Sequence, residues 1–231
     1  GDYCSVVVKT REGRPIKIEG NNLSPISQGG IFPQVEASVL TLYDNERLRG
    51  PVKSGDLVSW EMLDSEVSQK LNAVASQGGQ IRIVSNTILS PGTKKVIEQF
   101  KQKFPTTKHV SYDPVSSEGM LQANAESFGA RVIPSYDFSK AEVVVSFGAD
   151  FLGTWLSPIE FTKQYSKTRK LNNGKKDMSR HYQFESNLSL TGANADYRTM
   201  IKPSEEAAAV KALYDALRGQ SGAGMEHIAK A

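Results

Sequence analysis

Apolar residues along the chain alternate in its first part and recur in blocks after it. Residues 6–19 alternate as two short strands around a polar turn, which predicts a β-hairpin. The following stretch, 20–33, is rich in Gly, Pro, Ser and Asn and predicts a loop. Val35 then begins a series of apolar residues at helical spacing. We therefore predict a small β-rich subdomain over residues 1–52.

Strands and helices alternate in the remainder, residues 53–231. Strands are predicted at 81–85, 108–113, 141–149 and 181–190, and helices begin near Ser59, Ser90, Ser117, Ser157 and Ser204. The run 141–149 is continuously apolar, which is typical of a central strand in a parallel sheet. The pattern predicts an α/β class chain whose second domain is Rossmann-like, a mostly parallel sheet with helices on both faces.

Three local patterns add detail to the predicted helices and strands. Ser157 and Glu160 have the spacing of a capping box at the start of a helix. In the strand near 182, Tyr182 and Phe184 alternate with Gln183 and Glu185, which is typical of a strand with two different faces. In the last helix the inward side is predicted for Val210, Leu213, Tyr214 and Leu217.

Composition narrows the classes of function. Of the 231 residues, 39% are hydrophobic and 23% charged, as in ordinary globular proteins. The net charge of +3 comes from scattered basic residues, so we expect no nucleic-acid partner. The sequence has no run of about 18 apolar residues, as a membrane span needs, and no signal-peptide pattern opens it.

Residues that commonly perform chemistry are sparse. Cys4 is the only cysteine, and one thiol cannot form an internal disulfide, a zinc site or a four-thiolate cluster by itself. The histidines 109, 181 and 227 lack metal-ligand spacing, which favours structural roles. The turns 85–87 and 148–150 lack the glycine patterns of nucleotide loops. Binding of a phosphate or ribose by their backbone N–H groups is the sharper interpretation, and ordinary strand-to-helix turns, with Asp150 capping the second, are the default.

Basic residues concentrate between positions 163 and 180. A solvated helix face and loop is the default interpretation of such a run, and a docking surface for a partner or for anionic headgroups is the sharper one. The candidate partner contacts are Lys163, Lys167, Lys175, Lys176 and Arg180.

The order of several motifs resembles the first two domains of the molybdopterin-dependent oxidoreductase superfamily. The similar segments are, in order, CSVVVKTREGRPIKIEGN, LSPISQGGIF, ERLRGP, VSWEMLD, AEVVVSFGADF and NADYRTMIKPSEE. They cover nearly the whole chain. In that superfamily the first segment is a hairpin that holds an iron–sulfur cluster, so the resemblance supports a separate N-terminal subdomain.

The chain departs from that superfamily at the positions that bind cofactors. Cys4 stands at the third cluster cysteine, whereas Phe32 stands at the fourth, and a phenyl ring supplies no thiolate. The loop that would ligate molybdenum offers Ser116 but no cysteine. Gly148 of the family's turn remains, and Asp150 replaces its usual Asn. We expect these five positions to be vestigial, with no catalytic residue, metal or cofactor in this chain.

One branch of the superfamily shares this character, the molybdopterin-like half of the iron–sulfur subunit of bacterial alternative complex III, a quinol:electron-acceptor oxidoreductase. The segments VEASVLTLYDNERLRGP and KLNNGKKDMSRHYQFESNLSLTGANADYR resemble that branch. The resemblance implies a ferredoxin-like half of the same polypeptide that holds iron–sulfur clusters. It also implies partners that include a haem-bearing multihaem cytochrome and membrane-integral quinol-oxidising subunits, on the periplasmic side of the inner membrane.

Three hypotheses about function follow from these residues. The leading one is a non-catalytic scaffold domain that positions electron-carrying neighbours in a respiratory membrane complex. The alternative is a fragment of an active molybdopterin and iron–sulfur oxidoreductase whose remaining ligands lie outside this sequence. A soluble nucleotide-binding enzyme is the third, and it depends on fold analogy alone.

Overall fold

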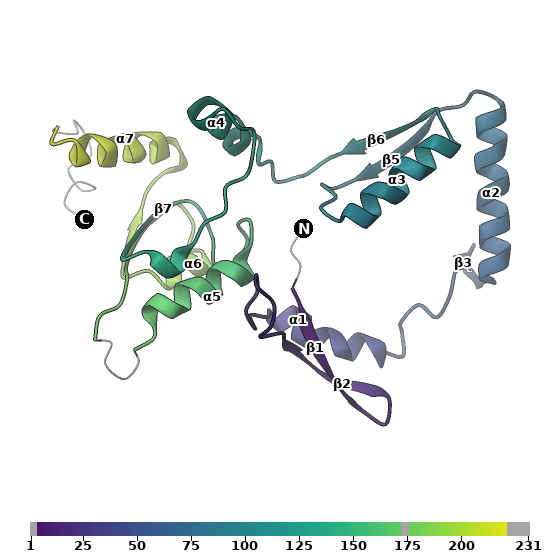
Figure 1. The fold of residues 1–231 in the computed structure, drawn as a ribbon, viewed down its shortest axis with the longest axis horizontal. Helices are drawn as coiled ribbons and strands as arrows, with labels where there is room; N and C mark the ends of the chain where they lie inside the picture. The colour runs from purple at the N-terminus through teal and green to yellow at the C-terminus, as the bar shows by residue number, and fades with distance from the viewer. Residues whose placement is uncertain (1–3, 172–175, 221–231) are drawn as a thin grey trace. The chain divides into compact units, whose positions relative to one another are not determined.

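The computed structural model describes residues 4–171 and 176–220, which divide into two compact units (Figure 1). One unit comprises Leu40–Pro134, and the other combines Asp2–Val39 with Ser135–Ala231. Each is described by itself. The domains predicted over 1–52 and 53–231 stay a prediction.

The first unit contains a parallel pair of strands joined by a helix. Strand β5 (Ile81–Ser85) pairs in parallel with β6 (Thr107–Ser111), and α3 (Pro91–Lys103) forms the crossover between them. The unit also contains β3 (Val52–Lys53), β4 (Asp56–Leu57), α2 (Trp60–Ser76) and α4 (Glu118–Phe128), and the short 3₁₀ helix η1 (Ser38–Leu42) straddles its start. The predicted strand–helix alternation is confirmed over this stretch.

Two helices of this unit begin where the sequence predicts. Ser59 accepts a hydrogen bond from the Met62 backbone N–H at the start of α2. Ser90 does the same for Thr93 at the start of α3, and Pro91 occupies the first helical position. A Ser hydroxyl satisfies an N–H group that the helix itself cannot satisfy, and this requirement is local.

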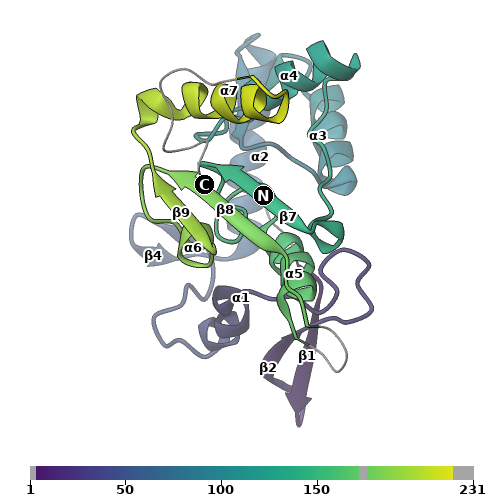
Figure 2. The ribbon, with the colours of Figure 1, turned by 90° about the vertical axis from the view of Figure 1, so that its left-hand side faces the viewer.

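The second unit is built on a three-stranded parallel sheet (Figure 2). The strands are β7 (Val143–Phe147), β8 (Arg180–Glu185) and β9 (Tyr197–Met200), in that order. The helices are α1 (Pro33–Ala37), α5 (Pro158–Arg169), α6 (Leu190–Ala193) and α7 (Glu206–Leu217), with the 3₁₀ turns η2 (Phe138–Lys140) and η3 (Pro203–Glu205). The hairpin β1 (Val6–Arg11) and β2 (Arg14–Gly20) is antiparallel, as predicted.

Two apolar clusters fill this unit, one on each face of the sheet. The first contains Val144 of β7 with Phe151, Leu152, Phe161 and Tyr165. The second contains Phe184 of β8 with Ile201 and Ala209. Val144 lies beside His181 in the sheet register, and alternation along β8 turns Phe184 to the opposite face. Both faces of β8 are therefore buried.

The α/β fold class is confirmed, and the arrangement of strands corrects one expectation. The strands within the described residues form several small sheets, two of them parallel. The run 141–149 does not give a central strand, because β7 lies at the edge of its sheet and β8 is the strand with two neighbours. Of the three valines of β7, only Val144 is buried, against the aromatic cluster, whereas Val143 and Val145 are exposed.

The expected inward side of the last helix is wrong, and the polar residues of β8 are buried. Gln183 and Glu185 are buried along with Phe184, because they hydrogen-bond to one another inside the unit. In α7 the buried residues are Ala209 and Ala212, whereas Val210, Tyr214 and Leu217 are exposed. Small side chains allow that helix to approach the core closely.

The predicted capping box at α5 is also wrong. Ser157 occupies the N-cap of this helix, but its side chain makes no capping hydrogen bond. Its backbone, with φ −137° and ψ 67°, lies outside the extended region that directs an N-cap hydroxyl at the helix. Glu160 instead accepts a hydrogen bond from the Gln164 amide at 3.0 Å, one turn along.

Candidate functional site at the carboxyl ends of the strands

The carboxyl ends of β7, β8 and β9 meet at one edge of the sheet, where α/β proteins usually bind ligands. Gly148 follows β7 there with a positive φ of 62°, and its backbone N–H donates to the Phe184 carbonyl at 2.8 Å. A Cβ added to Gly148 would lie 2.9 Å from Oε1 of Glu206, in the first turn of α7. A carboxylate therefore occupies the space directly beside this turn.

The crevice at this edge is small and acidic. Its free volume is about 30 Å³, and its lining includes the carboxylates of Glu185 and Glu206. Lys202 also lines it, but its ammonium group lies 3.3 Å from the carboxylate of Glu205. This space has room for about one water molecule and excludes a pterin. The charge of Glu185 is paired with Arg198, so size decides, and the residues present do not fit a molybdopterin cofactor at this crevice.

Asp150 closes the turn that follows β7. Its Oδ1 accepts hydrogen bonds from the backbone N–H of Thr191 at 3.0 Å and from the Thr191 hydroxyl at 2.8 Å. The same hydroxyl oxygen accepts from the Leu152 N–H at 2.9 Å, so Thr191 bridges two segments while fully buried. Oδ2 of Asp150 accepts from the Thr154 hydroxyl at 3.2 Å. The expected turn-capping role of Asp150 is confirmed.

The segment that resembles the cluster-binding loop is closed on itself by Asn21. The Asn21 carbonyl accepts hydrogen bonds from the N–H groups of Ser24 and Gly29 at 3.1 and 3.0 Å, and its side-chain amide donates to the Ser5 hydroxyl at 3.0 Å. Gly29 has φ 81°, a conformation that side chains rarely adopt. Hydrogen bonds of the Asn21 backbone and side chain thus close the loop.

The two cluster positions that can be seen do not form a metal site. Cys4 is a half-buried free thiol, and burial raises its pKa, which disfavours the thiolate that a cluster needs. Phe32 is half-buried, and its carbonyl accepts from the N–H groups of Val35 and Glu36 at the start of α1. Among the described residues, no group of three His, Cys, Asp or Glu side chains could hold a metal ion.

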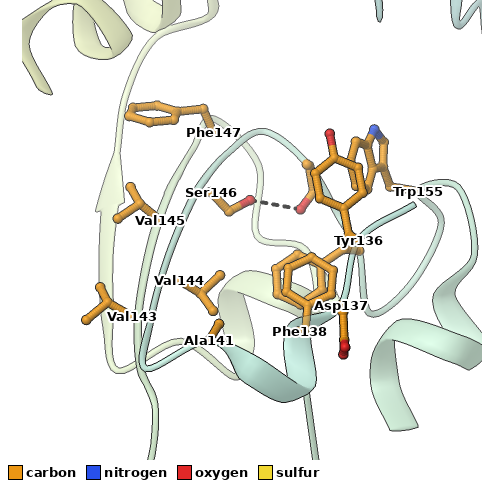
Figure 3. Close-up of a pocket in the computed structure, with 12 residues that line it drawn as sticks. Tyr136, Asp137, Phe138, Ala141, Val143, Val144, Val145, Ser146, Phe147 and Trp155 are labelled. Carbon is orange, nitrogen blue, oxygen red and sulfur yellow. Dashed lines mark hydrogen bonds between the residues drawn. The ribbon is translucent and has the colours of Figure 1, made fainter. Parts of the chain in front are cut away.

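An open groove follows the outer edge of β7 and has a volume of about 480 Å³ (Figure 3). Tyr136, Phe138 and Trp155 present their rings on one side, and the strand residues from Val143 to Phe147 form the other. Ser146 turns its hydroxyl to the Ala149 carbonyl at 3.1 Å. The lining is therefore apolar, with few polar groups free to orient a small substrate.

The remaining predicted positions carry other contacts. Ser116 is exposed in the first unit, and its hydroxyl accepts from the Glu118 N–H at 3.1 Å. Also in that unit, His109 contacts the Ser85 hydroxyl at 2.8 Å, consistent with a structural histidine. The third histidine, His227, lies outside the described residues.

The basic stretch is partly used in packing. Arg169 is paired with Asp196, at 2.6 Å between Nη2 and Oδ1, and Lys167 donates to the Gln28 side chain. Lys163 is half-buried, whereas Lys176 and Arg180 are exposed. Lys175 lies outside the described residues. The part of this stretch that can be followed contains both structural and exposed cations.

The sequence analysis did not predict a row of buried polar side chains on β8. His181, Gln183 and Glu185 lie on one face of the strand at 0, 1 and 5% exposure. Arg198 donates to Glu185 at 2.5 Å, and the Ser189 hydroxyl donates to the same carboxylate at 2.6 Å. The strict alternation of polar and aromatic residues indicated a strand with two different faces, but it did not indicate that the polar face is buried as well.

Comparison with known proteins gives two informative matches, and no family model matches the chain. The chain is 24% identical over 220 residues to the menaquinone reductase, molybdopterin-binding-like subunit of Nitratidesulfovibrio vulgaris (strain Hildenborough). That alignment covers 88% of this chain and 29% of the relative. The structure is similar to acetylene hydratase from Pelobacter acetylenicus, with a TM-score of 0.57 and 14% identity, over 94% of this chain and 30% of that protein.

These matches agree on architecture, and the chain spans less than a third of either protein. No helix among the described residues has the length and apolar character required to cross a bilayer. The chain has a molybdopterin oxidoreductase-like fold.

Proposed function

We propose that this chain is a non-catalytic, molybdopterin oxidoreductase-like scaffold domain of a respiratory membrane complex. The observation that carries the proposal is the lack of room at the sheet edge where a cofactor would bind. There the crevice measures about 30 Å³, and Glu206 stands beside the turn at Gly148. A relative named as a molybdopterin-binding-like subunit of menaquinone reductase supports the respiratory context.

In the finer form of the proposal, the complex is alternative complex III and transfers electrons from quinol to a periplasmic or oxidase acceptor. The domain then lies on the periplasmic side of the inner membrane and holds no cofactor. Iron–sulfur clusters belong to a ferredoxin-like half of the same polypeptide, and haems belong to a multihaem cytochrome. The other neighbours are membrane-integral quinol-oxidising subunits. Resemblance of residues 35–51 and 170–198 to that branch supports this form.

The rival is an active molybdopterin oxidoreductase, and metal analysis separates the two functions. The native complex is purified, and molybdenum and tungsten are measured per copy of this polypeptide, together with pterin released by oxidation. We expect neither metal nor pterin in stoichiometric amount. Iron is not diagnostic, because clusters elsewhere in the complex would supply it. One molybdenum or tungsten per polypeptide would overturn the proposal.

A further inference from the structure

A continuous series of aromatic rings runs through the second unit. The ring centroids of Trp155 and Tyr136 lie 5.3 Å apart, those of Tyr136 and Phe138 6.1 Å, and those of Phe138 and Phe151 4.5 Å. Phe151 then lies 5.7 Å from the ring of Tyr165. Trp155, Tyr136, Phe138 and Phe151 all line the groove along β7, and Figure 3 labels Trp155, Tyr136 and Phe138. Trp155 is partly exposed and Tyr165 is buried, so the series links the surface to the core.

Tyr165 ends the series against a histidine. Its phenol oxygen lies 3.0 Å from Nδ1 of His181 and 3.2 Å from the carbonyl oxygen of Asn194. Tyr165 is 6% exposed and His181 is fully buried. A phenol and an imidazole held together in the core form a pair that can exchange a proton without water.

The polar row on β8 fixes the direction of this hydrogen bond. Burial disfavours the charge of Glu185, but hydrogen bonds from Arg198 and Ser189 outweigh burial and hold its pKa below the ordinary value, so the carboxylate only accepts. The Gln183 amide nitrogen therefore donates to it at 3.3 Å, and the amide oxygen faces Nε2 of His181 at 3.3 Å. Nε2 thus carries the proton of the imidazole. Nδ1 keeps its lone pair, and the single phenolic proton of Tyr165 is shared between Nδ1 at 3.0 Å and the Asn194 carbonyl oxygen at 3.2 Å.

We propose that Tyr165 and His181 form a proton-coupled redox pair, which a strong one-electron oxidant reaches through the ring series that begins at Trp155. In the oxidation one electron leaves the Tyr165 ring for the oxidant, which is reduced by one electron. The phenolic proton moves from Oη to Nδ1 of His181, leaving a neutral tyrosyl radical and an imidazolium. Reduction by one electron returns the proton to the phenol.

The charges around the pair are compatible with this reaction. The Arg169 guanidinium lies 5.2 Å from the Tyr165 ring centroid and would oppose a positive ring, but the Asp196 carboxylate pairs with it. The same carboxylate accepts the backbone N–H of His181 at 2.8 Å, close to the imidazolium that would form. Burial raises the pKa of Tyr165 to about 12, so the phenol keeps its proton until the electron leaves.

Burial also lowers the pKa of His181, which keeps the imidazole neutral and able to accept the proton. Glu185 stands two residues along the same row and adds a negative charge on the imidazole side. The pair therefore begins with the protonation states that the reaction requires.

A photochemical experiment tests the pair in the full 231-residue chain. A ruthenium tris-bipyridine complex, oxidised by a flash in the presence of persulfate, serves as the one-electron oxidant, and electron paramagnetic resonance detects the radical. We expect a neutral tyrosyl radical that is lost in Y165F and kept in Y112F, since Tyr112 is exposed. W155F should slow its formation, because it removes the oxidisable indole at the exposed end of the series, whereas Phe138 and Phe151 serve only as a packed medium through which the electron tunnels.

A measurement on the unsubstituted chain avoids dependence on the folding of variants. Histidine labelled with ¹⁵N is incorporated, and electron–nuclear double resonance measures coupling of the radical to a histidine nitrogen. We expect one coupled nitrogen and slower radical formation in deuterium oxide. The proposal is overturned if the tyrosyl signal survives in folded Y165F, or if the labelled chain shows no coupled nitrogen.

Discussion

Arg169 and Asp196 form a two-pronged ion pair that joins α5 to the start of β9. Nη1 of Arg169 lies 2.8 Å from Oδ2 of Asp196, and Nη2 lies 2.6 Å from Oδ1. The same guanidinium donates to the Ser179 carbonyl at 2.6 Å. Asp196 in turn accepts the His181 N–H, so one pair orders the entries to β8 and β9. Part of the basic stretch therefore stabilises the fold.

Loss of the Asp196 charge should destabilise the second unit. D196N removes an acceptor from a largely buried guanidinium, and hydrogen bonds to charged groups contribute about 1.5–3 kcal/mol. We expect the free energy of unfolding, measured by urea titration, to fall by about that amount. D177N is the matched control, because Asp177 is exposed in the adjoining loop. Equal stability of the two variants would contradict the structural role.

Acid should weaken the same unit through Glu185 and Asp196. The pKa of Asp196 is lowered from 3.8, chiefly by the hydrogen bond from Arg169. That of Glu185 is lowered from 4.5, because the Arg198 and Ser189 hydrogen bonds outweigh burial. A folded-state pKa below the unfolded one gives stability that is complete above the unfolded pKa and is lost as pH falls through the folded value.

The check is the melting temperature measured from about pH 7 down to about pH 3, with R198M beside the unsubstituted chain. We expect R198M to melt lower at neutral pH, because Glu185 is left buried without its cation. Its decline in acid should be shallower, since the pKa of Glu185 no longer lies so low. A variant with an undiminished acid decline would show that Arg198 does not set this pKa.

Local signals in the sequence predicted the elements, and tertiary contacts decided how they were used. Ser59 and Ser90 cap their helices as expected, because an N-cap acts within one turn. The burial of Gln183 could not be predicted in this way, because it depends on His181 and Glu185 together. The edge position of β7 likewise depends on pairing between distant segments, which apolar content does not encode.

The candidate site shows the same division. Turn-capping by Asp150 follows from its place after an apolar strand, and the structure confirms it. The carboxylate of Glu206 beside Gly148 joins residues far apart in the sequence. No sequence motif predicted the contact between Gly148 and Glu206, although this contact argues against a cofactor at this edge.

Alanine substitutions at Gly148 and Gly129 distinguish the cost of backbone strain from the cost of steric contact. Both have positive φ, 62° and 71°, so alanine at either position costs roughly 1 kcal/mol or more in conformation. Only at Gly148 would the new Cβ meet another group, Oε1 of Glu206 at 2.9 Å, whereas space is open at Gly129. We expect G148A to lower the free energy of unfolding more than G129A.

A double variant identifies the source of the difference. E206A removes the carboxylate that the new Cβ would meet, so G148A combined with E206A should lose only the conformational cost. Urea titration of the unsubstituted chain, G148A, E206A and the double variant measures the coupling energy between the two positions. An equal loss for G148A and G129A would mean that Glu206 moves aside freely.

Thr191 should be indispensable for the turn at Asp150. T191V keeps the shape of the side chain but removes the hydroxyl, leaving the Leu152 N–H without its acceptor in a buried setting. An unsatisfied buried donor costs about 1–3 kcal/mol. T191S keeps the hydroxyl and is the control, with loss of a methyl group only. Thermal unfolding should place T191V below T191S, and the reverse order would contradict the bridging role.

Charge reversal in the basic stretch tests whether it docks a partner. The double variant K175E/K176E should weaken assembly of the proposed complex, because exposed cations act on acidic partners mainly by speeding association. The melting temperature of the isolated chain should not change. The matched control is K94E/K95E, because Lys94 and Lys95 are also consecutive lysines and are exposed at the start of α3. Co-purification of the partner subunits and the salt dependence of their association rate measure the effect. The deficit should shrink as salt screens the charges, and equal assembly by both variants would show that the stretch is only a solvated surface.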